Sequence, residues 1–174
     1  MMKIRKCREK DIAVVTAFYD RVVEYLECHV NYPRWVYKEY PSESFVRQMT
    51  DENSLYICFE NDEIVGAFVL NEDPQGNYRK GKWSRDIPDG EYLVIHALAI
   101  ATDKHGRGLG SEIVNFCIEE ARKNGYKALR LDAVPDNIPA LKLYKKSGFA
   151  YVGDEDLDRG IDYIPSFSLL EMNF

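Results

Sequence analysis

The sequence predicts an α/β or α+β fold with a mixed, largely antiparallel central sheet of six to seven strands and helices on both faces of the sheet. Two observations support this: β-rich runs are bounded by turn residues, and apolar residues between them recur at helical spacing. The chain has 174 residues and is 45% hydrophobic, which suffices for one well-buried core. We therefore expect a single domain over residues 1–174.

The first quarter of the chain predicts a strand and two helices. Residues 2–7 suit a short strand, and apolar residues at helical spacing predict a helix over 11–29, with Asp11 placed to cap it. Residues 31–41 hold two prolines and five aromatic residues, which favours an irregular segment. A shorter helix is expected over residues 42–49.

The middle of the chain predicts a hairpin and a buried strand. Two β-rich runs, residues 54–60 and 64–72, flank a short polar turn. Residues 92–100 are apolar at nearly every position, which is typical of a strand covered on both faces. The intervening residues 71–90 form a connection long enough to suggest a functional or mobile loop.

The last third predicts two helices alternating with strands. A helix begins near Leu109 and stops at Asn124-Gly125, and residues 128–134 suit a strand. Asn137 can cap the next helix, which should end before Gly148. Strands over 149–153 and 165–174 complete the chain.

Composition excludes several classes of protein. A net charge of −6 argues against nucleic-acid binding, which needs a basic face to neutralise phosphates. No run of eighteen apolar residues exists and no signal peptide is recognisable, so we expect a cytoplasmic protein that does not bind membranes. The four cysteines are widely spaced, which favours reduced, mostly buried thiols and no metal site.

The segment HGRGLGSE, residues 105–112, predicts an anion site. It follows a strand and opens a helix, where glycines allow close backbone approach and first-turn N–H groups lack internal partners. A P-loop is excluded because Gly110 is followed by Ser111 and Glu112 and not by lysine.

A dinucleotide fingerprint is the alternative that spacing alone leaves open. It would run through Gly106, Gly108 and Ser111, with Asp132 as the ribose-binding acid. Against it, five residues separate the strand from the first glycine, and too little chain follows to complete a doubly wound sheet.

Two sequence blocks resemble the GNAT superfamily of N-acetyltransferases. The family's pyrophosphate loop reads Gln or Arg, two residues, Gly, one residue, then Gly or Ala; here His105 takes the first place, followed by Gly108 and Gly110. The second block matches at Asn137, Ala140, Tyr144 and Gly148-Phe149. The resemblance covers residues 94–149 and departs from the pattern at His105.

The resemblance implies that acetyl-CoA is the co-substrate. Its pantetheine arm would bind the strand end at Leu98, Ala99 and Ile100, where an N–H would face the oxyanion. The family's sheet splays beside this strand and opens a slot for the thioester. The pyrophosphate would lie on the backbone of His105, Gly106, Arg107, Gly108, Leu109, Gly110 and Ser111, and Asn137 matches a further CoA-contacting position.

The resemblance also implies catalytic residues for acetyl transfer to an amine. Tyr144 matches the proton donor to the departing thiolate. The base is either His96, which would titrate in a useful range, or Asp132, where some relatives carry a carboxylate; either can act through water.

The acceptor pocket is expected to use residues 31–41 and the long loop, with Trp35, Tyr37, Tyr40 and Trp83 as walls. The acceptor would be a primary amine of a small molecule or peptide. The alternative function is a non-catalytic CoA-binding sensor, which keeps the glycine segment and needs no acid or base. The oligomeric state stays open, and a homodimer is one of its options.

Overall fold

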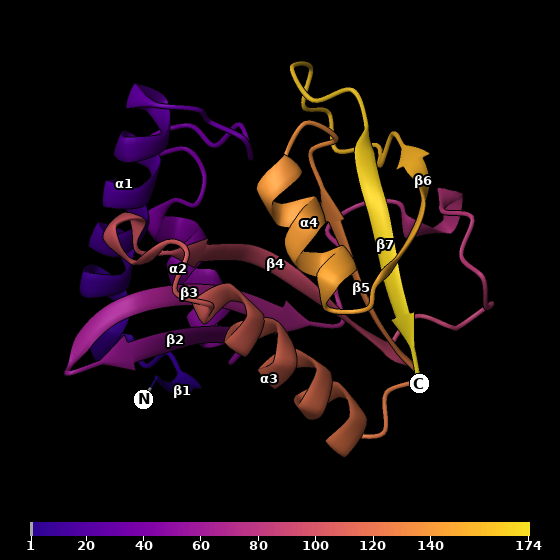
Figure 1. The fold of residues 1–174 in the computed structure, drawn as a ribbon, viewed down its shortest axis with the longest axis horizontal. Coiled ribbons are helices and arrows are strands. Elements are labelled where there is room, and N and C mark those ends of the chain that lie inside the picture. Colours follow the sequence, from indigo (N-terminus) through magenta and orange to yellow (C-terminus); the bar gives the residue numbers. More distant parts are fainter. Residues whose placement is uncertain (1) are drawn as a thin grey trace. The chain divides into compact units, whose positions relative to one another are not determined.

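A seven-stranded mixed sheet with the order β1-β2-β3-β4-β5-β7-β6 organises the chain in the computed structural model, which describes residues 2–174. Strand β4 pairs with β5 in parallel, whereas the β1–β2, β2–β3, β5–β7 and β6–β7 pairs are antiparallel. The predicted fold class is therefore confirmed. The elements, traced in Figure 1, are β1 (Lys3–Lys6), α1 (Ile12–Cys28), α2 (Glu43–Asp51), β2 (Leu55–Glu60), β3 (Glu63–Asn71), β4 (Tyr92–Ile100), α3 (Leu109–Lys123), β5 (Ala128–Ala133), α4 (Ile138–Lys146), β6 (Ala150–Glu155) and β7 (Phe167–Asn173).

The described chain groups into two units, and the first contains residues up to Leu70 together with His96–Leu109. Its core forms where the apolar stripe of α1 meets α2, β2 and β3. Helix α1 has the helical apolar period that the sequence predicted, so one face of it is buried. The core residues include Val15, Phe18, Tyr19, Val22, Val46, Met49, Leu55, Ile57, Ala67 and Val69.

The second unit contains Asn71–Ile95 and Gly110–Phe174. Its core gathers apolar side chains of β4, β5 and β7 with residues from the connections before β4 and between β6 and β7. These connections therefore contribute buried apolar surface and not only exposed loops. The core residues are Tyr78, Ile87, Tyr92, Val94, Ala128, Val134, Leu157, Ile164, Phe167 and Leu169.

Polar side chains cap the N-termini of α2 and α4. The Ser42 hydroxyl accepts a hydrogen bond from the Phe45 N–H, and the Asn137 side chain accepts one from the Ala140 N–H, which confirms the predicted cap of α4.

Asp11 occupies the N-cap position of α1, as predicted, but its side chain makes no capping bond to the helix. Its carboxylate accepts two hydrogen bonds from the Arg5 guanidinium, at 2.7 and 3.0 Å, and one from the Arg8 N–H. A bidentate charge-assisted pair is stronger than a neutral cap bond, so the carboxylate turns toward β1.

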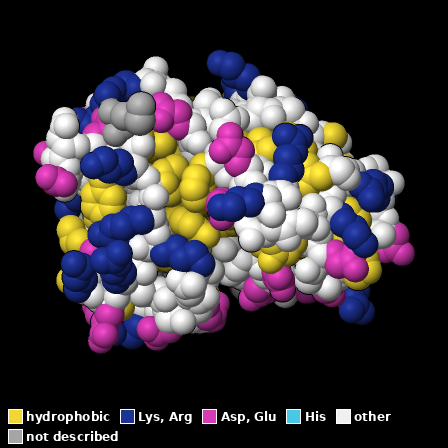
Figure 2. Space-filling model, turned by 90° about the horizontal axis from the view of Figure 1, so that it is seen from below, with side chains coloured by type: hydrophobic (Ala, Val, Ile, Leu, Met, Phe, Trp, Pro, Cys, Tyr) yellow, Lys and Arg dark blue, Asp and Glu magenta, His cyan; other side chains and the backbone are white. Residues whose placement is uncertain are grey.

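Charged side chains of both signs are interspersed over the face shown in Figure 2, with hydrophobic side chains between them. Within residues 2–174, no helix combines the length and apolar content needed to cross a bilayer. In the same residues, no group of three or more His, Cys, Asp or Glu side chains is arranged to hold a metal ion.

Replacing Asp11 tests the pair with Arg5. The Arg5 guanidinium is the main cause that lowers the pKa of the Asp11 carboxyl in the folded state. The pair therefore stabilises the fold above the unfolded pKa and loses this effect as pH falls through the folded pKa. We expect Asp11→Asn to lower the free energy of unfolding by about 1 kcal/mol at pH 7, since Arg5 is partly exposed.

Urea unfolding at pH 7 and at pH 3 measures this effect. The difference between Asp11→Asn and the unmodified protein should shrink at pH 3. The control Asp51→Asn alters an exposed residue at the end of α2 and should change stability by less than about 0.5 kcal/mol. An Asp11→Asn effect that is equal at both pH values would contradict the ionic origin.

Candidate active site

Strand β4 changes its backbone conformation at Ala97. Residues 92–96 are buried, as the apolar run predicted, but Ala97 has φ +47°, which is left-handed and uncommon for a residue other than glycine. The Tyr19 hydroxyl of α1 donates a 2.8 Å hydrogen bond to the Ala97 carbonyl oxygen. The regular pleat of the strand is therefore interrupted between His96 and Leu98.

The glycine segment after β4 has the backbone of an anion cradle. Gly106 and Gly108 have φ +78° and +84°, and a Cβ built on either would meet nothing within 4 Å. Leu109 starts α3 directly afterwards, so the first-turn N–H groups of this helix have no intrahelical acceptors. Unpaired backbone donors at the start of a helix can bind an anion.

Gly110 has a different role from the other two glycines. A Cβ at this position would lie 3.1 Å from the Leu143 side chain of α4. Its φ is not in the left-handed range, so the constraint on a larger residue here comes from packing and not from backbone conformation. Gly110 therefore serves close packing of α3 against α4.

Two side chains of the glycine segment already have partners. Nε2 of His105 lies 3.3 Å from the Ile100 carbonyl oxygen, which requires Nε2 to carry the hydrogen. Half-exposed Arg107 pairs with Glu60 at the end of β2, with Nη1 3.0 Å from Oε2. His105 thus links the segment to the end of β4, and Arg107 has a carboxylate with which an anionic ligand would compete.

Tyr144 lies on α4 and is almost fully buried, with 6% of its surface exposed. Its ring packs edge-on against Phe149, with centroids 5.7 Å apart. Burial raises the pKa of Tyr144 well above its ordinary value, with smaller contributions from Cys117 and Asp132. The hydroxyl therefore remains protonated at physiological pH and can serve only as a donor of its proton.

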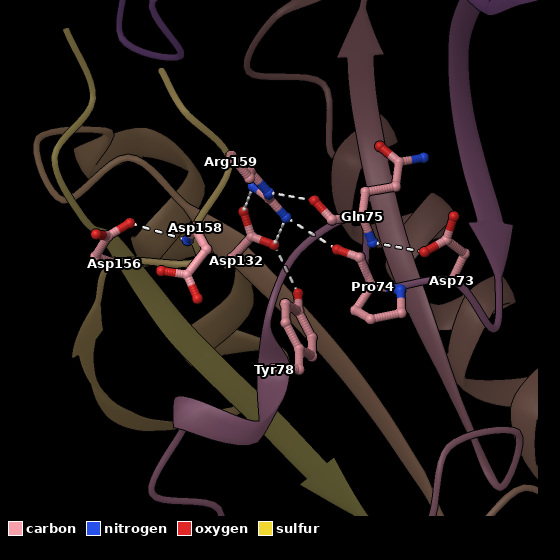
Figure 3. Close-up of polar contacts among 8 residues, drawn as sticks. All are labelled: Asp73, Pro74, Gln75, Tyr78, Asp132, Asp156, Asp158 and Arg159. Carbon is pink, nitrogen blue, oxygen red and sulfur yellow. Dashed lines mark hydrogen bonds and ion pairs between the residues drawn. The ribbon is translucent and has the colours of Figure 1, made fainter. Parts of the chain in front are cut away.

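Asp132, at the end of β5, belongs to a polar network with Arg159 and Tyr78 (Figure 3). Both of its oxygens accept hydrogen bonds of 2.7 Å from the Arg159 guanidinium, and Oδ2 also accepts a 2.6 Å bond from the Tyr78 hydroxyl. Burial and the Asp132 charge raise the pKa of Tyr78, which keeps it a donor. Both Asp132 oxygens are thus already engaged by donors from the protein.

The same network pins the long loop before β4 to the connection between β6 and β7. Arg159 donates to the carbonyl oxygens of Gln75 and Pro74, at 2.6 and 3.0 Å (Figure 3). The Asn77 N–H donates to the Leu157 carbonyl oxygen at 2.8 Å. At least four of the five guanidinium N–H groups of Arg159 donate hydrogen bonds, so this residue holds two loops and one carboxylate at once.

The predicted aromatic walls lie in both units. Trp35 and Tyr40 pack together, with centroids 6.0 Å apart, and Trp35 also contacts Tyr19. Partly buried Tyr37 contacts Lys38, whose ammonium lies 5.3 Å from the ring centroid. Trp83 belongs to the second unit, where the Arg130 guanidinium lies 4.2 Å from its ring centroid.

His96, the other candidate base, is buried on β4 with 8% of its surface exposed. Sequence reasoning missed Tyr19, Tyr78 and Arg159. Tyr19 lies on the apolar face of the helix predicted over 11–29, and its hydroxyl partner lies 78 residues away. Arg159 carried no signal because its carboxylate partner is set by the tertiary fold.

The chain belongs to the acetyltransferase (GNAT) family, whose sequence pattern it matches over residues 12–149. Among curated relatives, it is 26% identical over 152 residues to the L-amino acid N-acyltransferase MnaT of Escherichia coli, covering 85% of this chain and 79% of MnaT. It is 29% identical over 99 residues to the uncharacterized N-acetyltransferase MJ1207 of Methanocaldococcus jannaschii, covering 57% of this chain and only 40% of that relative.

Solved structures show the same fold. A GNAT-family acetyltransferase from Streptococcus agalactiae superimposes with a TM-score of 0.81 at 19% identity, over 99% of this chain and 95% of that one. The structure of yncA from Salmonella typhimurium, described with its cofactor acetyl-CoA, gives 0.69 at 15% identity over 99% and 93% of the two chains. Recognition of the family from its two motif blocks is therefore confirmed.

Replacing Arg159 tests the polar network. Arg159→Ala would leave the buried Asp132 carboxylate without its cation and release both loops. We expect the free energy of unfolding to fall by about 2–4 kcal/mol in urea denaturation. The matched control Arg79→Ala removes an exposed pair with Asp89 and should cost less than about 1 kcal/mol. Equal losses in the two variants would show that the network stabilises the fold no more than an exposed ion pair does.

Proposed function

We propose that the chain is an acetyl-CoA-dependent N-acetyltransferase that transfers the acetyl group to a primary amine by direct attack in a ternary complex. Membership of the GNAT family is the observation that carries this proposal. The left-handed glycines before α3 supply backbone donors where the family binds pyrophosphate. The acetyl-CoA named with yncA supports the same co-substrate.

The acceptor is proposed as a primary amine of a small molecule or peptide, and amino acids form the first class to test. The name of MnaT, an L-amino acid N-acyltransferase, supports this order. Partly buried Trp35, Tyr37, Tyr40 and Trp83 stay the proposed contacts of the acceptor. The cytoplasmic location and a homodimer also stay predictions.

Bound acetyl-CoA would supply an activated acetyl group as its thioester. Residues Leu98, Ala99 and Ile100 would hold the pantetheine arm through their backbone. Residues 105–111 would hold the pyrophosphate, and Asn137 would make a further contact with CoA. A new bond forms between the amine nitrogen and the carbonyl carbon while the bond from that carbon to sulfur breaks. The ammonium proton leaves to a base, and the sulfur receives a proton.

Tyr144 is proposed to give the proton to sulfur. Its raised pKa would oppose transfer to an ordinary thiolate with a pKa near 8.5. Burial of the thiolate in the proposed site would raise the pKa of that group too, so the pKa values of acid and acceptor would shift in the same direction. The transfer then occurs as the bond to sulfur lengthens and its basicity grows.

His96 is proposed as the base, directly or through one water, in preference to Asp132. Both Asp132 oxygens already accept hydrogen bonds from Arg159 and Tyr78, so we assign Asp132 a positioning role. The demand on a base depends on the amine: about one lysine-like amine in a few thousand is neutral at pH 7, against about one α-amine in six.

An acetyl-CoA consumption screen tests the function. Amino acids, polyamines, aminoglycosides and short peptides are each incubated with the protein and acetyl-CoA, and free thiol is measured. We expect at least one amine class to release CoA together with an acetylated amine detected by mass spectrometry. CoA binding without turnover on any amine would favour a sensor instead, and failure to bind CoA would reject both functions.

Replacing the proposed acid separates chemistry from binding. Tyr144→Phe keeps the buried ring and removes the proton, so we expect kcat to fall by about 10²–10⁴-fold. The Kd for CoA, measured by calorimetry, should change by less than about threefold, or 0.7 kcal/mol. The control Tyr151→Phe removes an exposed hydroxyl on β6 and should leave both constants unchanged. Unchanged kcat in Tyr144→Phe would remove this residue from the mechanism.

The pH dependence of kcat provides a second test of Tyr144. A general acid works while it is protonated, and the raised pKa of Tyr144 keeps it protonated to higher pH than an ordinary tyrosine. As pH is raised, kcat with saturating substrates should therefore not decrease until about pH 10 or higher. A descending limb with a midpoint between pH 8 and 9 would indicate a different acid.

A further inference from the structure

The hydrogen bond between Tyr19 and Ala97 has a role that neither the motifs nor the family resemblance assigns. It joins helix α1 to the one left-handed position described within β4, directly before the Leu98–Ile100 stretch proposed to contact acetyl-CoA. All of these residues belong to the first unit. The hydroxyl thus acts on the backbone next to the reacting group's proposed site.

The planarity of the peptide bond determines what this contact controls. In a trans peptide the C=O and the next N–H point in opposite directions. The hydroxyl of Tyr19 attracts the Ala97 carbonyl oxygen toward α1, so the Leu98 N–H is directed away from Tyr19. Because the two groups share one rigid plane, fixing the carbonyl fixes the donor.

We propose that Tyr19 is a positioning residue that aims the Leu98 N–H at the carbonyl oxygen of the bound acetyl group. This inference rests on the proposed acetyltransferase function and names a residue that would act on its oxyanion donor. A donor aimed in advance stabilises the charge that develops on that oxygen without reorganisation during the reaction. Tyr19 itself would not touch acetyl-CoA.

The surroundings of Tyr19 suit this role. The side chain is fully buried, and its ring packs edge-on against Phe18 and Trp35, with centroids 5.7 and 6.2 Å away. Burial raises the pKa of Tyr19 well above its ordinary value, so the hydroxyl stays a donor. A hydroxyl held by a packed ring can offset the unfavourable left-handed conformation of Ala97.

Infrared spectroscopy of the acetyl-CoA complex tests the inference without an acceptor amine. The probe is acetyl-CoA labelled with ¹³C at the acetyl carbonyl, and the measured quantity is its stretching frequency, which falls when the oxygen accepts a strong hydrogen bond. We expect a lower frequency in the unmodified complex than in free acetyl-CoA. Tyr19→Phe should lose most of this shift, and kcat with an active amine should fall by about 10–100-fold while the Kd for acetyl-CoA stays similar.

Tyr92→Phe is the matched control. It removes the hydroxyl of a buried tyrosine in β4, where the partner is the Asp89 side chain and not the backbone. This variant should keep the frequency shift and kcat of the unmodified protein. A shift retained in Tyr19→Phe, or equally lost in both variants, would overturn the inference and leave the acetyltransferase proposal standing.

The unmodified protein distinguishes failure of the inference from failure of the function. Binding of acetyl-CoA without any frequency shift would overturn the inference alone. Absence of acetyl-CoA binding would overturn the proposed function and the inference with it.

The double variant Tyr19→Phe/Ala97→Gly separates positioning from stability. Glycine adopts positive φ without strain, so the double variant should regain the stability lost in Tyr19→Phe, or fold where the single variant does not. Its carbonyl is no longer held, so the frequency shift should stay lost. Recovery of the shift together with stability would show that Tyr19 has only a structural role.

Discussion

The left-handed backbone at Ala97, held by the Tyr19 hydroxyl, is the constraint on which the proposed chemistry depends. Before it, residues 92–95 pair in parallel with β5 as a regular buried strand. After it, the chain runs to Ile100 and into the glycine segment. A buried strand cannot leave its pleat without a partner for the redirected carbonyl, and a tyrosine from α1 supplies that partner.

In the second unit, the ionisable side chains of Asp132 and Arg130 contact hydrogen-bond donors or aromatic rings from distant segments. Asp132 is balanced by Arg159 and Tyr78, and the network ties two connections together. Arg130, with 2% of its surface exposed, lies between the rings of Trp83 and Tyr92, with centroids 4.2 and 4.3 Å away. It stands opposite Glu171 in the β5–β7 register. Because both Asp132 oxygens already accept hydrogen bonds, His96 remains the proposed base.

Local signals in the sequence predicted most of the fold. The apolar period of α1, the hairpin of β2 and β3 and the Asn137 cap are decided by neighbouring residues, so they could be recognised without tertiary information. The Asp11 cap failed because Arg5 competes for the carboxylate, and that competition depends on how β1 meets the helix. The spacing of apolar residues indicates a helix cap at Asp11 but does not reveal the ion pair with Arg5.

The candidate site was predictable where backbone chemistry dominates and unpredictable where distant side chains meet. Gly106 and Gly108 have the conformations that an anion cradle needs. The packing of Gly110 depends on Leu143 of α4. The hydrogen bonds that Asp132 accepts depend on Arg159, which lies 27 residues further along the chain. The spacing of residues in the sequence does not predict such long-range contacts.

A crystal structure of the protein with CoA is the measurement that tests the central claim most directly. We predict that the pyrophosphate accepts hydrogen bonds from backbone N–H groups of residues 105–111 and that the pantetheine arm lies against the backbone of Leu98–Ile100. Binding of CoA elsewhere on the chain, with the glycine segment making no phosphate contact, would contradict the account.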